Sequence, residues 1–397
     1  TQDAAAAGGV VNIILKDPRA GQRGGVLKVG GGLSQESGQQ DRRNQISLQL
    51  DGKGSSGEWQ KLGYSLSANR MDNRVESRSE LTRLGSTRTQ DTHSQSTHAM
   101  LMPRLEYQPA AQQKWSVDGF LGQFESQSRY SGSQGAGQQD SQTEPLRLNV
   151  RYEQGSEKDR KDTVRLSWSQ EDETQDNSQG TVLHLREHSE ETALGYSGSQ
   201  RLGSTHQLKY GTDWRQTRIR NNVEADLNED RQAVYLEENW QLAPRHTLTA
   251  GLRQERLQRS GLVQYQQDSS NPALAYRYQP TPAWSWQLGY NEASKAPRSD
   301  DLVPTVSVSP SSDAGSLNNP DTGGNPQLRP ERIHALESTL GYNTADGGFN
   351  LTGFVRQIDD YIEKTVQLEQ GRYVQRPANQ SRAHTRGLEL SARYALR

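Results

Sequence analysis

The sequence predicts an all-β protein, an antiparallel up-and-down transmembrane β-barrel of which this chain holds about 16 strands. Three observations predict it: a two-residue alternation of apolar and polar side chains, connections that alternate between short and long, and tryptophans near the short connections. The 397 residues are only 30% hydrophobic and their mean hydropathy is -0.99, which is too polar for several conventional cores. Apolar side chains on the outside of a barrel account for this composition.

The alternation is clearest between residues 207 and 217. Leu208, Tyr210 and Trp214 fall on one face of an extended chain, while Lys209 and Asp213 fall on the other. A strand has this pattern when its two faces meet different solvents. The same alternation recurs over residues 114–121, 146–153 and 388–396.

Clusters of Gly, Pro, Asn, Asp and Ser separate the expected strands, each about 9 to 16 residues long, and no helix is predicted. In chain order the strands are expected to begin near Gly25, Asn44, Lys61, Thr97, Lys114, Pro145, Thr163, Val182, His206, Arg231, His246, Ala273, Ala283, Arg332, Gly348 and Arg382.

Two classes of connection join these strands. Short turns are expected at residues 109–113, 154–160, 201–205, 243–245, 281–282 and 344–347. Long hydrophilic loops are expected at residues 74–96, 130–144, 171–180, 260–271, 295–330 and 367–379. Short turns on one rim and long loops on the other are typical of outer-membrane barrels.

Five tryptophans lie in or near the short connections: Trp59, Trp115, Trp240, Trp284 and Trp286. Amphipathic rings gather at the boundary between lipid and water, so this placement predicts an interfacial girdle. The alternative is that these rings fill the half-buried sheet of a soluble protein.

Composition excludes several classes of protein. The formal charge of -2 shows no basic excess, which argues against a nucleic-acid partner. Cysteine is absent, so disulfides and thiolate chemistry are excluded. No apolar run approaches the roughly 18 residues that a membrane helix requires. The 7 Trp and 15 Tyr, with the regular alternation, argue against disorder.

Four separated segments carry a family resemblance. In order they are GGVVNIILK at residues 8–16, AVYLEENWQL at 233–242 with LTAGLR at 248–253, residues 290–331 ending in NPQLRPE at 325–331, and RGLEL at 386–390. Together and in this order they resemble TonB-dependent outer-membrane receptors of the siderophore-receptor type. The segment NPQLRPE at residues 325–331, called the asparagine-proline motif below, is the most specific of the four.

The resemblance implies a domain organisation and a function. Residues 1–20 would be the C-terminal end of the plug domain and its linker, and residues 21–397 a partial transmembrane barrel of 22 strands when whole. A fragment lacking most of the plug and the last strands is expected. The implied function is TonB-coupled uptake of a scarce extracellular ligand, such as a ferric siderophore, across the outer membrane of a Gram-negative bacterium.

The implied partners are outer-membrane lipid, the small-molecule ligand, and TonB through a segment outside this chain; no nucleic acid is expected. Two glutamates, Glu337 and Glu389, alternate with apolar neighbours and should point into the lumen, as a solvated wall or as contacts to plug or substrate. Asn325 before Pro326 should be extended, and Pro330 should fix the backbone where a strand begins at Glu331. This motif therefore sets the geometry of loop and strand.

No catalytic, cofactor or metal site is predicted, and the chain is not expected to be an enzyme. His93 and His98 differ in strand parity, so they should not converge on a metal. Asp300 with Asp301, and the corresponding pair at 359–360, should point to opposite faces of extended chain rather than form an acid-base dyad.

The loop at residues 295–330 holds Arg298, Asp300, Asp301, Asp313 and Asp321. It either closes over a ligand or is an ordinary solvated loop, and its ligand contacts stay unassigned. Three other functions remain open: a passive porin-like channel, an outer-membrane enzyme, and an adhesin-like β-protein. The ligand, a signalling extension and closure of the fragment are not determined by the sequence.

Overall fold

The computed structural model describes residues 23–36, 39–54, 57–83, 86–132, 135–178, 183–222, 225–308 and 314–395. Within these residues one sheet of 16 antiparallel strands dominates, and each strand pairs with its neighbours in chain order. The strands are β1 (Arg23–Glu36), β2 (Gln39–Lys53), β3 (Leu62–Arg83), β4 (Ser86–Ala110), β5 (Gln113–Gly132), β6 (Gly135–Gly155), β7 (Arg160–Asn177), β8 (Leu183–Leu202), β9 (His206–Asn221), β10 (Leu227–Ala243), β11 (His246–Gly261), β12 (Tyr265–Tyr278), β13 (Trp284–Lys295), β16 (Glu331–Asn343), β17 (Gly347–Asp359) and β20 (Arg382–Tyr394).

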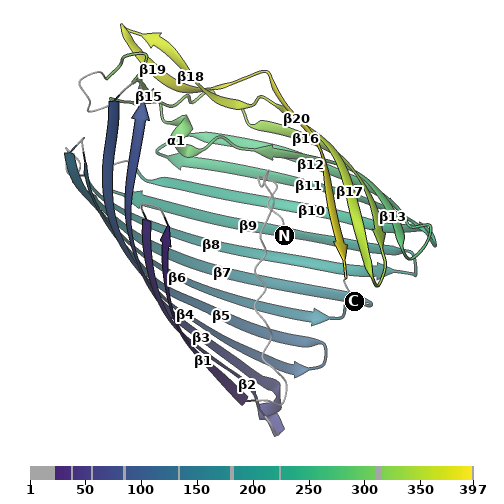
Figure 1. Cartoon of the computed structure of the whole chain (residues 1–397). Coiled ribbons are helices and arrows are strands. Elements are labelled where there is room, and N and C mark those ends of the chain that lie inside the picture. The colour runs from purple at the N-terminus through teal and green to yellow at the C-terminus, as the bar shows by residue number, and fades with distance from the viewer. Residues whose placement is uncertain are drawn as a thin grey trace.

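The sheet curves into a wall around an open interior, with β1 at one edge and β20 at the other (Figure 1). The predicted up-and-down order and the number of strands are confirmed. The barrel is not closed within the described residues, since no pairing joins β1 to β20. The predicted plug end at residues 1–20 lies outside the described part of the chain.

The predicted lengths of strands and loops were wrong at one rim. Four of the six expected long loops, at residues 74–96, 130–144, 171–180 and 260–271, are largely strand, and β4 alone spans 25 residues. Pairing in β3–β4 runs out to Arg83 opposite Ser86. Polar side chains here do not mark a loop, because a strand with water on both faces still satisfies its backbone through the ladder.

The remaining two long connections are not simple loops either. The segment after β13 contains α1 (Ser299–Leu302), β14 (Val306–Ser307) and β15 (Asp321–Gly323), and the segment after β17 contains β18 (Ile362–Glu369) and β19 (Arg372–Asn379). These four strands form a second sheet in the order β14-β15-β19-β18, called the rim sheet below (Figure 1).

Two short helices in the described part of the chain correct the expectation that there is none. They are α1 and a single 3-10 turn, η1 (Gly57–Lys61), which joins β2 to β3. None of the helices among the described residues is long and apolar enough to cross a membrane.

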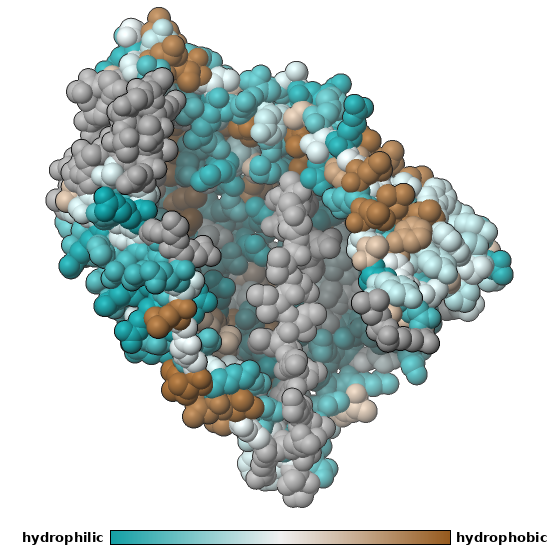
Figure 2. All heavy atoms as spheres, viewed as in Figure 1, coloured by the Kyte–Doolittle hydropathy of each residue, from teal (hydrophilic) through white to brown (hydrophobic). Residues whose placement is uncertain are grey.

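Cross-strand register places the large apolar side chains on the outer face. Leu148 lies opposite Trp168, Leu194 opposite Trp214, and Leu236 opposite Leu252. Many of these side chains are exposed, Leu236 by 52% and Leu252 by 45%. A view into the hollow shows a mostly hydrophilic inner wall with hydrophobic residues along its margins (Figure 2). Polar inside and apolar outside is the reverse of a soluble barrel and suits a lipid surround.

Aromatic rings gather on the outer face beside the short turns, as predicted for Trp115, Trp240, Trp284 and Trp286. Ring centroids are 4.5 Å apart in Trp115–Tyr152, 5.3 Å in Trp240–His206, 4.7 Å in Trp284–Tyr342 and 6.0 Å in Trp286–Tyr276. Trp59 lies in η1 at the same rim and is 70% exposed. These residues form one belt next to the short turns.

A second set of outer-face tryptophans lies nearer the other rim. The indole N–H of Trp168 donates to Glu190 at 3.1 Å, and that of Trp214 donates to Asp230 at 2.9 Å. Beyond this level the outer face turns charged, with ion pairs such as His188–Asp172 at 2.7 Å. The apolar surface is therefore a band bounded on both sides by amphipathic rings.

Candidate functional site at the inner wall and the rim sheet

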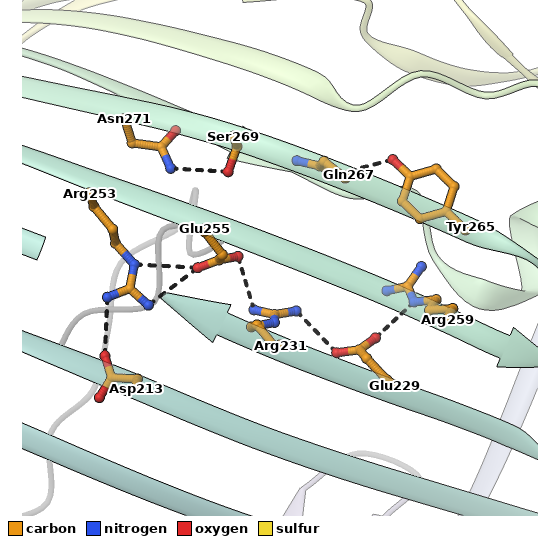
Figure 3. Close-up of polar contacts among 10 residues, drawn as sticks. All are labelled: Asp213, Glu229, Arg231, Arg253, Glu255, Arg259, Tyr265, Gln267, Ser269 and Asn271. Carbon is orange, nitrogen blue, oxygen red and sulfur yellow. Dashed lines mark hydrogen bonds and ion pairs between the residues drawn. The ribbon is translucent and has the colours of Figure 1, made fainter. Parts of the chain in front are cut away.

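The inner wall carries a chain of alternating charges across β9, β10 and β11 (Figure 3). Period-two alternation directs the side chains of Glu229, Arg231, Arg253 and Glu255 to the lumen, the face opposite Leu236 and Leu252. We call the following six residues the charged ladder: Asp213, Arg253, Glu255, Arg231, Glu229 and Arg259.

Each ladder residue is held by the next. Arg253 contacts Asp213 at 3.2 Å and Glu255 at 3.3 Å, and Arg231 contacts Glu255 at 3.8 Å and Glu229 at 3.3 Å. The network resists rotamer changes because most members have partners on two sides. It therefore holds the guanidinium groups of Arg231 and Arg253 in fixed positions on the inner wall.

The ladder ends at the rim. Arg259, whose side chain is only 8% exposed, donates to Glu229 at 2.8 Å and to the carbonyl of Pro297 at 2.6 Å. Its guanidinium carbon also lies 5.7 Å from the ring centre of Tyr265. Pro297 lies at the start of the connection after β13, two residues beyond the end of that strand, so the ladder joins the inner wall to that connection.

The rim sheet is built from two segments that are distant in sequence. The parallel pair β15–β19 places Asp321 opposite Val374. The adjacent hairpin β18–β19 turns at Gln370 and Gly371, both with positive φ (48° and 84°), as a two-residue turn of the primed type requires. The segments after β13 and β17 therefore form one structural unit, which we call the rim body.

Two arginines of β19 hold the rim sheet together. Arg372 forms a bidentate pair with Asp321, at 2.6 and 2.9 Å, and Asp321 is only 1% exposed. Arg376 bonds both oxygens of Glu369, at 2.8 and 3.1 Å, and donates to the carbonyl of Gly324. The hydrogen bond from Arg376 lowers the pKa of Glu369, and the bond to Asp321 raises the pKa of Arg372.

The asparagine-proline motif anchors this body, and the predicted start of a strand at Glu331 is confirmed. Asn325 accepts from the backbone N–H of Gln327 at 2.9 Å and donates to the carbonyl of Pro377 at 3.2 Å. Strand β16 begins at Glu331, directly after Pro330. Glu331 is 4% exposed and accepts from Ile362 N–H and from Lys295 Nζ, both at 2.9 Å.

A small apolar cluster lies beneath the rim. Leu328 of the motif packs with Leu302 of α1, Leu227 of β10 and Val263, which follows β11. Burial of such side chains contributes about 2 kcal/mol each. The cluster therefore attaches the rim body to the wall by apolar contact in addition to the polar contacts.

The two predicted aspartate pairs lie in different settings, since Asp300 and Asp301 belong to α1 and not to extended chain as expected. Asp359 pairs with Arg382 at 2.9 Å, whereas Asp360 pairs with Arg329. Asp300 contacts Arg298 at 3.1 Å on the surface, and the Asp301 carbonyl accepts from Asn325 N–H at 2.7 Å. The carboxylates of Asp359 and Asp360 thus pair with two different arginines.

The two histidines also lie apart. His93 faces Glu76 at 3.7 Å, while His98 stacks edge-on with Phe124 at 5.3 Å. No group of three or more His, Cys, Asp or Glu side chains suited to a metal occurs in the described ranges. Asp313 lies outside those ranges.

Register places Glu337 and Glu389 on the lumen face, as predicted from their alternation. Glu337 is opposite Gly289 on β13 and Phe354 on β17, and Glu389 is opposite Thr352. The charged ladder was not singled out from the sequence. The signal that was available is an acidic and a basic residue two apart on one strand face, as in Glu229 with Arg231 and Arg253 with Glu255.

Comparison with known proteins identifies the family. The sequence model for the β-barrel of TonB-dependent receptor-like proteins matches residues 19–397. The chain belongs to the TonB-dependent receptor β-barrel family. Members of this family are receptors and transporters rather than enzymes. Among curated proteins no match is found.

Solved structures share the fold at low sequence identity. The siderophore receptor PirA from Pseudomonas aeruginosa is 18% identical with a TM-score of 0.68, covering 97% of this chain and 65% of its own. A mutant of the ferric enterobactin receptor PfeA from the same organism is 16% identical with a TM-score of 0.75, covering 98% and 62%.

The Serratia marcescens hemophore receptor HasR, solved as a double mutant with its hemophore HasA and heme, is also similar. It is 13% identical with a TM-score of 0.67, covering 96% of this chain and 62% of its own. The chain thus spans less than two thirds of the length of each of these structures.

Proposed function

We propose that the protein is an outer-membrane receptor of a Gram-negative bacterium that takes up a scarce ligand, with energy supplied through TonB. The observation that carries this proposal is the 16-stranded wall with an apolar band outside and a charged ladder inside. Such a wall is suited to lipid on one face and hydrated contents on the other. Family membership adds the coupling to TonB.

An iron complex is the proposed cargo, with a ferric siderophore as the first candidate. PirA and PfeA are named as siderophore and ferric enterobactin receptors, and HasR as a hemophore receptor. The rim sheet offers a preformed surface at the mouth, since the ion pair of Arg372 with buried Asp321 and the bond from Arg376 to the Gly324 carbonyl hold its two long segments in one arrangement. We propose residues 1–20 as the end of a plug and residues 21–397 as barrel.

Uptake tests the proposal. The intact protein, expressed in a strain without siderophore receptors of its own, should restore growth under iron limitation with a supplied ferric siderophore. Growth should be lost when TonB is deleted. Growth that is restored equally without TonB would contradict coupled transport.

Two further measurements separate the alternatives. The intact protein in liposomes should conduct little current, because a plugged receptor is closed where a porin-like channel is open. Residues 1–397 expressed alone should not restore iron-limited growth, since this stretch matches the family's barrel rather than a whole receptor. Restored growth from that stretch would refute this expectation.

A further inference from the structure

Like charges lie directly opposite one another at two places on the inner wall. Arg151 of β6 pairs in register with Arg165 of β7, and Arg215 of β9 pairs with Arg231 of β10. Opposed like charges on adjacent strands are destabilising. Two such pairs occur between β6 and β10, and a negative charge placed between them would reduce the repulsion.

Carboxylates compensate only part of this charge. Arg215 has Glu191 at 3.6 Å, and Arg231 and Arg253 belong to the charged ladder. Within the described residues neither Arg151 nor Arg165 has a carboxylate oxygen within 4.0 Å. The Nε of Arg151 is buried and has no hydrogen-bond partner there. Two guanidinium charges thus remain without a direct carboxylate partner.

The wall between the two arginine pairs is hollow. A pocket of about 110 Å³ lies there, bordered by Arg165 on one side and by Arg215, Arg231 and Arg253 on the other. Asp213 also lines it, with its carboxylate paired to Arg253 at 3.2 Å, so four guanidinium groups face one carboxylate. Small residues from the intervening strands, including Ala193, Gly195 and Ala233, also line it. Glycine and alanine leave the guanidinium groups reachable from the lumen. We call this the arginine pocket.

We infer that the arginine pocket binds an oxyanion, a carboxylate or a phosphate group, at the inner wall. Planar guanidinium groups recognise both anions through paired N–H donors. The volume suits one such group rather than a large ligand. The ladder holds Arg231 and Arg253 in place before binding, which lowers the ordering cost of binding. The inference does not depend on which cargo the receptor carries.

The oxyanion has two possible sources: an acidic side chain from elsewhere in the intact protein, or a free anion in the lumen. Thiol labelling distinguishes them, and residues 1–397 contain no cysteine that would compete with an introduced one. Ser167→Cys places the reporter in the arginine pocket. Thr339→Cys is the matched control, because Thr339 also faces the lumen but lies 3.4 Å from Glu337.

The experiment compares a negatively and a positively charged methanethiosulfonate reagent on the intact protein in detergent. If the pocket is open, S167C should react about tenfold faster with the anionic reagent, since fixed charge raises local counter-ion concentration. T339C should prefer the cationic reagent. R151Q with R165Q should remove the S167C preference, and R165Q alone gives the same readout should the double variant fail to fold.

Inorganic phosphate identifies the source. Slower S167C labelling by the anionic reagent in phosphate, against chloride of equal ionic strength, supports a free oxyanion. Protection of S167C from both reagents that is relieved by R165Q supports an acidic side chain of the protein. Equal and unprotected rates with both reagents, or protection that R165Q does not change, would overturn the inference.

Discussion

The two rims of the wall are ordered by different forces. At the short-turn rim, aromatic rings stack on the outer face, as in Trp284 with Tyr342 at 4.7 Å. At the other rim, the ion pair of Arg372 with buried Asp321 ties two long segments into the rim sheet, and an apolar cluster attaches them to the wall. Rings suit a boundary with lipid, whereas a surface surrounded by water requires directional bonds and its own small core.

The largest expected effect is at the apolar cluster of the rim. Leu302→Ala removes a side chain that is 2% exposed and leaves a cavity beside Leu328. The opening free energy of the rim body should fall by about 3 kcal/mol. Amide hydrogen exchange over residues 296–308 and 314–330 measures it. The control is Leu317→Ala, since Leu317 is 61% exposed, and an equal effect there would contradict the role of the cluster.

The next effect is at the buried ion pair. Asp321→Ala removes both bonds from Arg372 and should weaken the β15–β19 pairing by about 2 kcal/mol. Limited proteolysis of the rim segments should show cleavage there while the wall stays intact. Asp300→Ala is the matched control because Asp300 forms only an exposed pair. Unchanged proteolysis of the Asp321 variant would show that the cluster alone holds the sheet.

A smaller effect is expected at the aromatic rim. Trp284→Ala loses ring contacts with Tyr342 and Phe349, the latter at 6.0 Å, and should cost about 1 kcal/mol. Urea unfolding in lipid vesicles measures the change in the free energy of unfolding. Amide hydrogen exchange in the rim sheet is the internal control, and its rates should stay unchanged. Loosening of the rim sheet by this variant would show that the two rims are coupled.

The smallest effect is a pH dependence confined to the rim sheet. Arg376 lowers the pKa of Glu369 below its ordinary 4.5. Glu369 therefore stabilises the β18–β19 hairpin above that ordinary value, and the contribution is lost as pH falls through the lowered folded-state pKa. Hydrogen exchange of the hairpin from pH 7 to pH 3 should show this loss in the wild type. The difference should be absent in Glu369→Gln.

Much of the wall was predictable from particular residues. Alternation around Leu208, Tyr210 and Trp214 correctly assigned lumen and outer faces, and the same parity placed Glu337 and Glu389 inside. Strand length was not predictable, because residues 74–96 are polar on both faces and read as loop. Polar side chains indicate that a segment contacts water. Whether the segment is a strand depends on hydrogen bonds to a partner strand elsewhere in the chain.

The candidate site divides in the same way. The motif at residues 325–331 was recognised from its order of residues, and the start of a strand after Pro330 followed from the constraints of proline. Its partners were not predictable: Pro377 and Ile362 come from the following long connection, through the bonds to Asn325 and Glu331. Such contacts arise only when two loops meet.

The sequence by itself determined the two faces of each strand, the sixteen-strand order and the positions of the tight turns, because each depends on side chains a few residues apart. Only the tertiary structure decided the rim sheet and the opposition of Arg151 to Arg165. Register depends on how far each hairpin extends, and a shift of one residue would turn these arginines to the outer face.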